Sequence, residues 1–132
     1  MRQINEQLVY SAGPTIFRAG LVIKDGGIRC SNGWLSIILD LVIKLEQRAR
    51  TLPPNEQLNV QCIKEKFGGL RFYVDCHNKF DEIDITAAET KAWNTCEECG
   101  GQGKHYSDGW KRILCDPCVI KWKEERRHAS RN

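Results

Sequence analysis

The chain has 132 residues, 41% of them hydrophobic, and a formal net charge of +3. This length suits one compact domain with a small appendage, and the apolar content excludes a wholly disordered chain. The mild charge permits an acidic partner without requiring one. No segment approaches the roughly 20 apolar residues of a membrane-spanning helix, so we expect no contact with a membrane.

Residues 1–30 give the weakest signals in the chain. Residues 8–10 and 21–23 are short apolar runs that predict strands, and Gly26-Gly27 predicts a turn. Ser31 then offers a helix N-cap. From residue 34 to 50 most positions are apolar, and the polar ones form a narrow stripe at helical spacing: Ser36, Asp40, Lys44, Gln47 and Arg48. The pattern predicts a largely buried helix over 34–50.

Residues 58–75 predict a β-hairpin that turns at Gly68-Gly69. With an even-length turn, alternation puts one apolar set on the core face: Ile63, Phe67, Leu70, Phe72 and Val74. Glu65 falls with this set, so we expect it at the rim, paired, or beside a bulge. The opposite face would carry Lys64, Lys66, Arg71 and Tyr73, with Lys66 nearly opposite Arg71.

A second helix is predicted over 82–94, with Thr86 and Glu89 as a capping box. A last helix should begin at Asp116-Pro117, since Asp suits the N-cap and Pro the first helical position. It would run to about residue 128 and turn three side chains inward: Val119, Ile120 and Trp122.

Two Cys-x-x-Cys pairs are the strongest motif in the chain. Cys96 and Cys99 form the first pair, and Cys115 and Cys118 follow after fifteen residues. Two intervening residues let both thiolates of one tight turn face the same ion, so the spacing predicts one structural zinc ion on four cysteines. The other cysteines, Cys30, Cys62 and Cys76, would be partly buried free thiols in a reducing cytoplasm, because no signal peptide is evident.

The zinc segment resembles a treble-clef finger and, in its layout, GATA-type fingers. The matching parts are the Cys96–Gly100 knuckle, a hairpin through 104–114 and a helix that opens at Cys115. We therefore expect an α+β fold in which a small antiparallel sheet is packed by helices and followed by a treble clef. The division would be a core over 1–93 and a zinc module over 94–132, packed as one unit.

A second resemblance rests on Lys64-Glu65-Lys66-Phe67-Gly68-Gly69-Leu70-Arg71-Phe72-Tyr73, together with Gly33-Trp34 and the two cysteine pairs. A group of small bacterial and phage proteins, usually without an assigned function, shares this core. The resemblance implies a bacterial or phage source, and the host cytoplasm if the protein is phage-encoded.

Basic and aromatic residues of the hairpin and the zinc segment form the candidate partner surface: Lys64, Lys66, Arg71, Tyr73, Trp110, Lys111 and Arg112. Basic residues beside aromatics are typical of nucleic-acid binding. A solvated surface is the alternative, because acidic residues such as Glu97 and Glu98 are interleaved with them. His105 reads as an ordinary hairpin residue, although it could replace a cysteine ligand or serve as the base of an HNH-type nuclease.

We therefore expect a non-catalytic, zinc-stabilised binding protein. Its partner would be a host or bacterial protein, whose action it would modulate and which could belong to a defence system. Nucleic-acid binding through the basic hairpin face and the finger is the alternative, and an enzyme comes third. The sequence predicts no oligomeric state.

Overall fold

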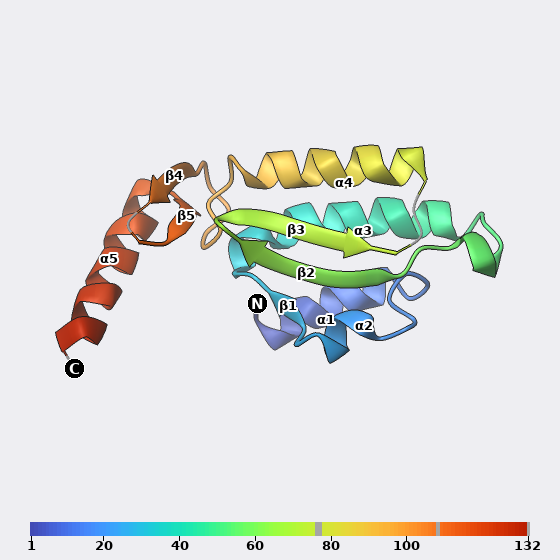
Figure 1. The fold of residues 1–132 in the computed structure, drawn as a ribbon, viewed down its shortest axis with the longest axis horizontal. Helices are drawn as coiled ribbons and strands as arrows, with labels where there is room; N and C mark the ends of the chain where they lie inside the picture. The colour runs from blue at the N-terminus through green and yellow to red at the C-terminus, as the bar shows by residue number, and fades with distance from the viewer. Residues whose placement is uncertain (76–77, 108, 132) are drawn as a thin grey trace.

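A computed structural model describes residues 1–75, 78–107 and 109–131 of the chain. Two long helices and a β-hairpin run side by side along its length, and a small hairpin with a final helix projects at one end (Figure 1). The helices are α1 (Gln3–Ala12), α2 (Leu21–Lys24), α3 (Leu35–Ala49), α4 (Lys79–Ala92) and α5 (Asp116–Arg131). The strands are β1 (Ile28–Arg29), β2 (Val60–Lys66), β3 (Gly69–Val74), β4 (Lys104–Ser107) and β5 (Lys111–Leu114). Short 3-10 turns precede α3 and β2, at η1 (Asn32–Trp34) and η2 (Pro54–Glu56).

The expected α+β class is confirmed. Strands β2 and β3 pair antiparallel, and the two-residue strand β1 adds to β2 in parallel, so the sheet order is β1-β2-β3. The helix predicted over 34–50 is α3, and its inward side supplies much of the core: Ile37, Ile38, Leu41, Val42, Leu45 and Ala49. Trp34 lies fully buried at its start. The narrow polar stripe thus placed α3 correctly, because a helix that is buried on most sides keeps its polar residues in one line at helical spacing.

One buried residue of α3 is charged. Glu46 is only 2% exposed, and its Oε1 accepts hydrogen bonds from the backbone N–H groups of Thr15, at 2.9 Å, and Ile16, at 3.1 Å. Its Oε2 accepts from Nε of Arg50 at 2.9 Å. Burial by itself raises the pKa of Glu46, but the hydrogen bonds from Thr15, Arg50 and Ile16 outweigh it and the pKa is lowered. The charge therefore fixes the segment after α1 to the core.

The strands predicted at 8–10 and 21–23 are wrong, because both runs lie in helices, α1 and α2. Three apolar residues in a row have no period that separates a strand from a helix, so tertiary contacts decided. Helix α1 packs against α3 and buries Val9, while α2 lies beside β2 and buries Val22. The turn expected at Gly26-Gly27 is present, and both glycines have positive φ.

The hairpin over 58–75 is confirmed, but its turn is Phe67-Gly68 and not Gly68-Gly69. Both turn residues have positive φ, 54° and 87°, as a two-residue hairpin turn of type I′ requires. Phe67 is therefore 65% exposed instead of lying on the core face. The prediction for the core face holds for Ile63, Leu70 and Phe72, which are all buried.

The register also corrects the expected charge pairing. Lys64 lies opposite Arg71, and Lys66 lies opposite Gly69. Glu65 has a partner, because its Oε2 accepts a hydrogen bond from the N–H of Gly68 at 2.7 Å. The irregularity in the ladder falls between Val60 and Cys62, away from Glu65.

Helix α4 begins three residues before the predicted start and ends at Ala92. Its capping box is Asn78 with Asp81, not Thr86 with Glu89. Glu89 instead accepts a hydrogen bond from the N–H of Phe72 at 3.1 Å, which ties the helix to β3. Sequence alone could not choose between two capping patterns eight residues apart, since both satisfy the same local rule.

Candidate metal centre and its junction with the core

The four predicted cysteines meet in space. Their ligand atoms all lie within 4.8 Å of one another, and Sγ of Cys99 is 3.5 Å from Sγ of Cys115. A tetrahedral zinc site with Zn–S bonds of about 2.3 Å separates its sulfur atoms by about 3.8 Å, so the donor set fits a metal of this kind. Among the described residues this is the cluster with metal-binding geometry, and His105 does not belong to it.

Local structure positions each sulfur atom. The first pair lies on a turn in which Gly100 has a φ of 81° and donates its N–H to the carbonyl of Cys96 at 2.9 Å. The second pair brackets the start of α5, where the carbonyl of Cys115 accepts from the N–H of Val119 at 2.9 Å. Strands β4 and β5 lie between the two cysteine pairs in the sequence and pair antiparallel, which brings the second pair back to the turn of the first.

The thiols differ in how readily they ionise. Burial opposes the ionisation of Cys96, but hydrogen bonds from the backbone of Cys99 and Cys115 lower its pKa to about 7. Burial and the neighbouring sulfur atoms raise the pKa of Cys118. Thiolates this close repel one another, so a bound cation would stabilise the ionised form of all four.

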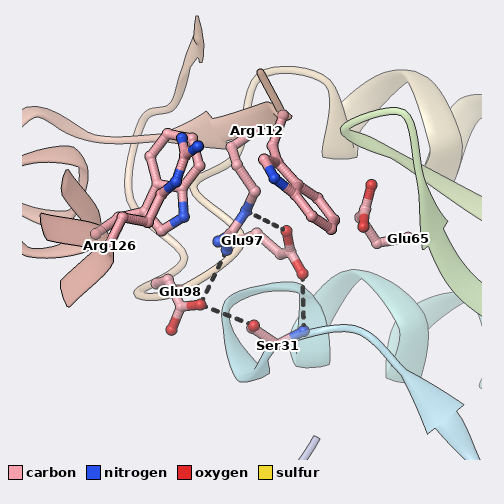
Figure 2. A pocket seen from close by; sticks show the side chains of 8 residues that line it. Ser31, Glu65, Glu97, Glu98, Arg112 and Arg126 are labelled. Carbon is pink, nitrogen blue, oxygen red and sulfur yellow. Dashed lines mark hydrogen bonds and ion pairs between the residues drawn. The ribbon is translucent and has the colours of Figure 1, made fainter. Parts of the chain in front are cut away.

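The turn of the first pair is attached to the core by its two acidic residues. Glu97 is only 4% exposed, and its Oε2 accepts from the N–H of Ser31 at 3.0 Å. Glu98 Oε1 accepts from the Ser31 hydroxyl at 2.8 Å and from Nη2 of Arg112 at 3.0 Å. Figure 2 shows Arg112 between the two carboxylates, with Ser31 below them. The Ser31 side chain therefore serves this junction. The sequence predicted it as the N-cap of the following helix, and that prediction is wrong, because its side chain makes no cap hydrogen bond.

Arg112 Nε forms an ion pair with Glu97 Oε1 at 3.3 Å. Within the described part of the chain, neither of these two buried atoms makes a hydrogen bond. Burial raises the pKa of Glu97, and the charge of Arg112 opposes this. The guanidinium of Arg112 also lies 5.5 Å from the ring centre of Trp122. Arg112 is thus occupied inside the protein, although the sequence had placed it on the partner surface.

Gly33 shows how closely the turn meets the core. A Cβ atom at this position would lie 2.2 Å from the carbonyl oxygen of Cys96 and 2.3 Å from that of Glu97. The N–H of Gly33 donates to the Glu97 carbonyl at 2.6 Å, and Nε1 of Trp34 donates to the carbonyl of Thr95 at 3.0 Å. Only a residue without a side chain allows this approach.

A pocket of about 450 Å³ opens beside this junction. Figure 2 shows its lining, in which three carboxylates and two guanidinium groups face one another. The lining residues are Ser31, Glu65, Glu97, Glu98, Trp110, Arg112, Trp122 and Arg126. The sequence suggested that the acidic residues of the finger are solvated, which is wrong for Glu97 because it is buried. The junction could have been predicted from Glu97 and Glu98, which lie between two cysteines of one turn, together with Arg112 on strand β5.

The structure separates the predicted partner residues into groups. Lys64, Arg71 and Tyr73 lie on the sheet face opposite the core, with Lys64 Nζ 5.9 Å from the ring centre of Tyr73. Lys66 and Phe67 lie at the turn of this hairpin, where Gly68 approaches the backbone of Lys111. Trp110 is 68% exposed beside the junction pocket. Ile120, expected inside, is exposed, whereas Val119 is buried.

Among the other cysteines, Cys30 and Cys62 are free thiols. Burial raises the pKa of Cys30 to about 12, so this thiol is held neutral. Cys76 lies outside the described residues. Within the described part of the chain, no helix is both long and apolar enough to cross a membrane.

No protein-family model, curated protein or solved structure matches this chain. The resemblance to small bacterial and phage proteins therefore stays a prediction, while its four-cysteine cluster is present in the structure.

Proposed function

We propose that this chain is a non-catalytic binding protein whose C-terminal module is a treble-clef finger held by one structural zinc ion. The convergence of the four sulfur atoms of Cys96, Cys99, Cys115 and Cys118 within 4.8 Å carries the proposal. The order of a cysteine turn, a hairpin and a helix that begins between the last two cysteines supports the treble clef. The division at residues 93 and 94 belongs to the same proposal.

A structural role for zinc follows from the donor set. Four thiolates complete a tetrahedral shell and leave no position for water or substrate. Cys96 is fully buried, which limits access to the ion from one side. Zinc would then contribute to folding and not to chemistry.

We favour a protein as the partner, in a bacterial or phage setting where the chain modulates a host or defence protein. Two large aromatic side chains, Phe67 and Trp110, are exposed on the same end of the molecule as the finger. Exposed aromatics are frequent anchors in protein interfaces. The finger also offers less free positive charge than its sequence suggests, because Arg112 pairs with Glu97 and Glu98.

Nucleic-acid binding is the second candidate, and one observation favours it. Lys64 and Arg71 are direct cross-strand neighbours on the face opposite the core. Like charges in this position are unfavourable unless water or an anion lies over them. A phosphate backbone would be such an anion.

The test combines metal analysis with partner capture. The tagged protein should purify with one zinc ion per chain. Capture from bacterial lysate should yield a specific protein that survives nuclease treatment and moderate salt, and the purified partner should then bind directly. Recovery of nucleic acid alone, released by salt and lost in Lys64→Glu/Arg71→Glu, would replace the first candidate with the second. Purification without zinc would refute the metal assignment.

A further inference from the structure

A second, smaller pocket lies where the β2–β3 turn meets the finger. Its volume is about 230 Å³, enough for one aromatic ring. The backbone at Gly68 lies so close to Lys111 that a Cβ there would be 3.2 Å from the Lys111 carbonyl, so the two hairpins form one wall. The pocket, here called the aromatic slot, is lined by Phe67, Gly68, Trp93, His105, Tyr106, Ser107, Lys111, Arg112 and Ile113.

Part of the slot is preorganised. The rings of Trp93 and His105 stack with their centres 4.8 Å apart and their planes 22° apart. His105 Nε2 lies 2.8 Å from the carbonyl oxygen of Trp93, which can only accept, so Nε2 carries a proton and donates it. A Cβ at Gly69 would lie 3.1 Å from the Trp93 ring. Side chains fixed in this way lose little entropy when a guest ring enters.

Lysine side chains flank part of the slot. Among the residues that the structure describes, no carboxylate lines the slot, whereas three line the junction pocket on the other side of Arg112. Lys111 is exposed at the slot, and Nζ of Lys66 lies 5.6 Å from the ring centre of Phe67. An aromatic floor with a lysine rim fits a guest that combines a ring with negative charge.

We propose that the aromatic slot binds an acidic segment of a partner protein, with one aromatic side chain of that segment inserted between Phe67 and the stacked rings of Trp93 and His105. This inference rests on the protein-binding function proposed above and names the chemistry of the partner. The inserted ring supplies apolar burial, and flanking carboxylates meet Lys66 and Lys111.

The surroundings favour a peptide over a nucleic acid. A nucleic-acid strand must continue out of the slot with one negative charge per nucleotide. On one side it would pass Asp116, which accepts from the Tyr106 hydroxyl at 2.8 Å. On the other side it would pass Glu97 and Glu98 beside Arg112. A peptide needs only a local cluster of negative charge and can leave the surface after the anchor.

The experiment uses the zinc-loaded full chain and follows the Trp93 indole N–H by NMR. The probe is the capped peptide Glu-Asp-Phe-Asp-Glu, with three comparisons: Ala replacing Phe, amide residues replacing the acids, and oligothymidine. We expect the first peptide to shift the Trp93 resonance, and each altered peptide to bind at least about tenfold more weakly. Oligothymidine should bind more weakly than the first peptide.

Two variants of the chain test the site itself. Phe67→Asn removes the ring while keeping a residue that tolerates positive φ, and Lys111→Glu reverses the rim charge. Each should weaken peptide binding by about tenfold or more, while Lys121→Glu, an exposed lysine of α5 outside the slot, should not.

Absence of a shift with the acidic aromatic peptide would overturn the inference, as would tighter binding of oligothymidine or unchanged binding by both variants. The proposed function is judged separately. If a purified partner still binds Phe67→Asn and Lys111→Glu as it binds the parent chain, the slot inference falls and the protein-binding function stands. If no protein partner is captured, the proposed function itself fails.

Discussion

The core and the C-terminal module are held together by different forces. Among the described residues, the main hydrophobic cluster contains 21 buried residues drawn from nearly every element up to β5, whereas the cluster of the module contains three: Cys96, Leu114 and Val119. Apolar burial can stabilise the first region, but three buried side chains cannot order a hairpin and a helix by themselves. We therefore infer that the module depends on its four cysteines, on its ion-paired junction with the core and on Ile113 of β5, which lies in the main cluster.

Metal removal should break this comparison most strongly. Structural zinc contributes about 10–16 kcal/mol of binding free energy in small zinc peptides, so Cys96→Ser or chelation should unfold residues 94–131 and abolish zinc content. The α3 and β2–β3 amides should keep their protection from hydrogen exchange, because their contacts lie within the core. Metal analysis and residue-resolved exchange would measure both effects.

The matched control is Cys62→Ser, which changes a free thiol outside the cluster. Its zinc content should equal that of the parent chain. Equal zinc loss in the two variants would contradict the assignment of four ligands.

Core truncation should give the opposite pattern. Leu45 is fully buried on α3, and Leu45→Ala should lower the free energy of unfolding by about 2–5 kcal/mol while zinc content stays unchanged. Ile43→Ala, on the same helix but 39% exposed, should cost clearly less. Denaturant unfolding with metal analysis provides the measurement, and loss of zinc from Leu45→Ala would show that the two regions depend on each other more than we infer.

The junction should respond in both regions at once. Gly33→Ala places a methyl group against the carbonyls of Cys96 and Glu97, so we expect a loss of about 1–3 kcal/mol in stability together with weaker zinc binding. Ser31→Ala removes only the hydroxyl contact with Glu98 and should cost about 1 kcal/mol. Unfolding curves recorded against a zinc-buffered series would separate the two variants, and equal behaviour would argue against a steric role for Gly33.

A pH dependence of stability is expected from Glu46. The pKa of Glu46 is lowered in the folded chain, so its contribution to stability is present above its unfolded pKa of about 4.3 and is lost as pH falls through the folded pKa. Glu46→Gln should lower stability at neutral pH by about 2 kcal/mol and make the curve flatter in this acid range. Urea unfolding between about pH 3 and about pH 7 would test this prediction. A pH curve of the variant that runs parallel to that of the parent chain would contradict it.

Local patterns in the sequence were sufficient for some elements and misleading for others. Helix α3, the presence of two hairpins and the helix start at Asp116-Pro117 were predicted correctly. Residues 8–10 and 21–23 were misread as strands, and the β2–β3 turn was placed one residue too late, which put exposed Phe67 in the core. Short apolar runs and adjacent glycines each allow two local solutions of similar energy, so long-range contacts choose between them.

The sequence by itself determined the four-cysteine cluster, because two Cys-x-x-Cys turns carry their geometry in their spacing. It also determined the buried helix, because the 3.6-residue period shows which side faces a core. Only the tertiary structure decided which charged residues are buried and which ion pairs they form. The sequence placed Arg112 on the candidate partner surface and left Glu97 as solvated surface, yet the two side chains meet at the junction. Phe67, Trp93 and His105 likewise line one slot although they lie far apart in the sequence. Residues so distant in sequence come together through the docking of whole elements, and no local pattern records that arrangement.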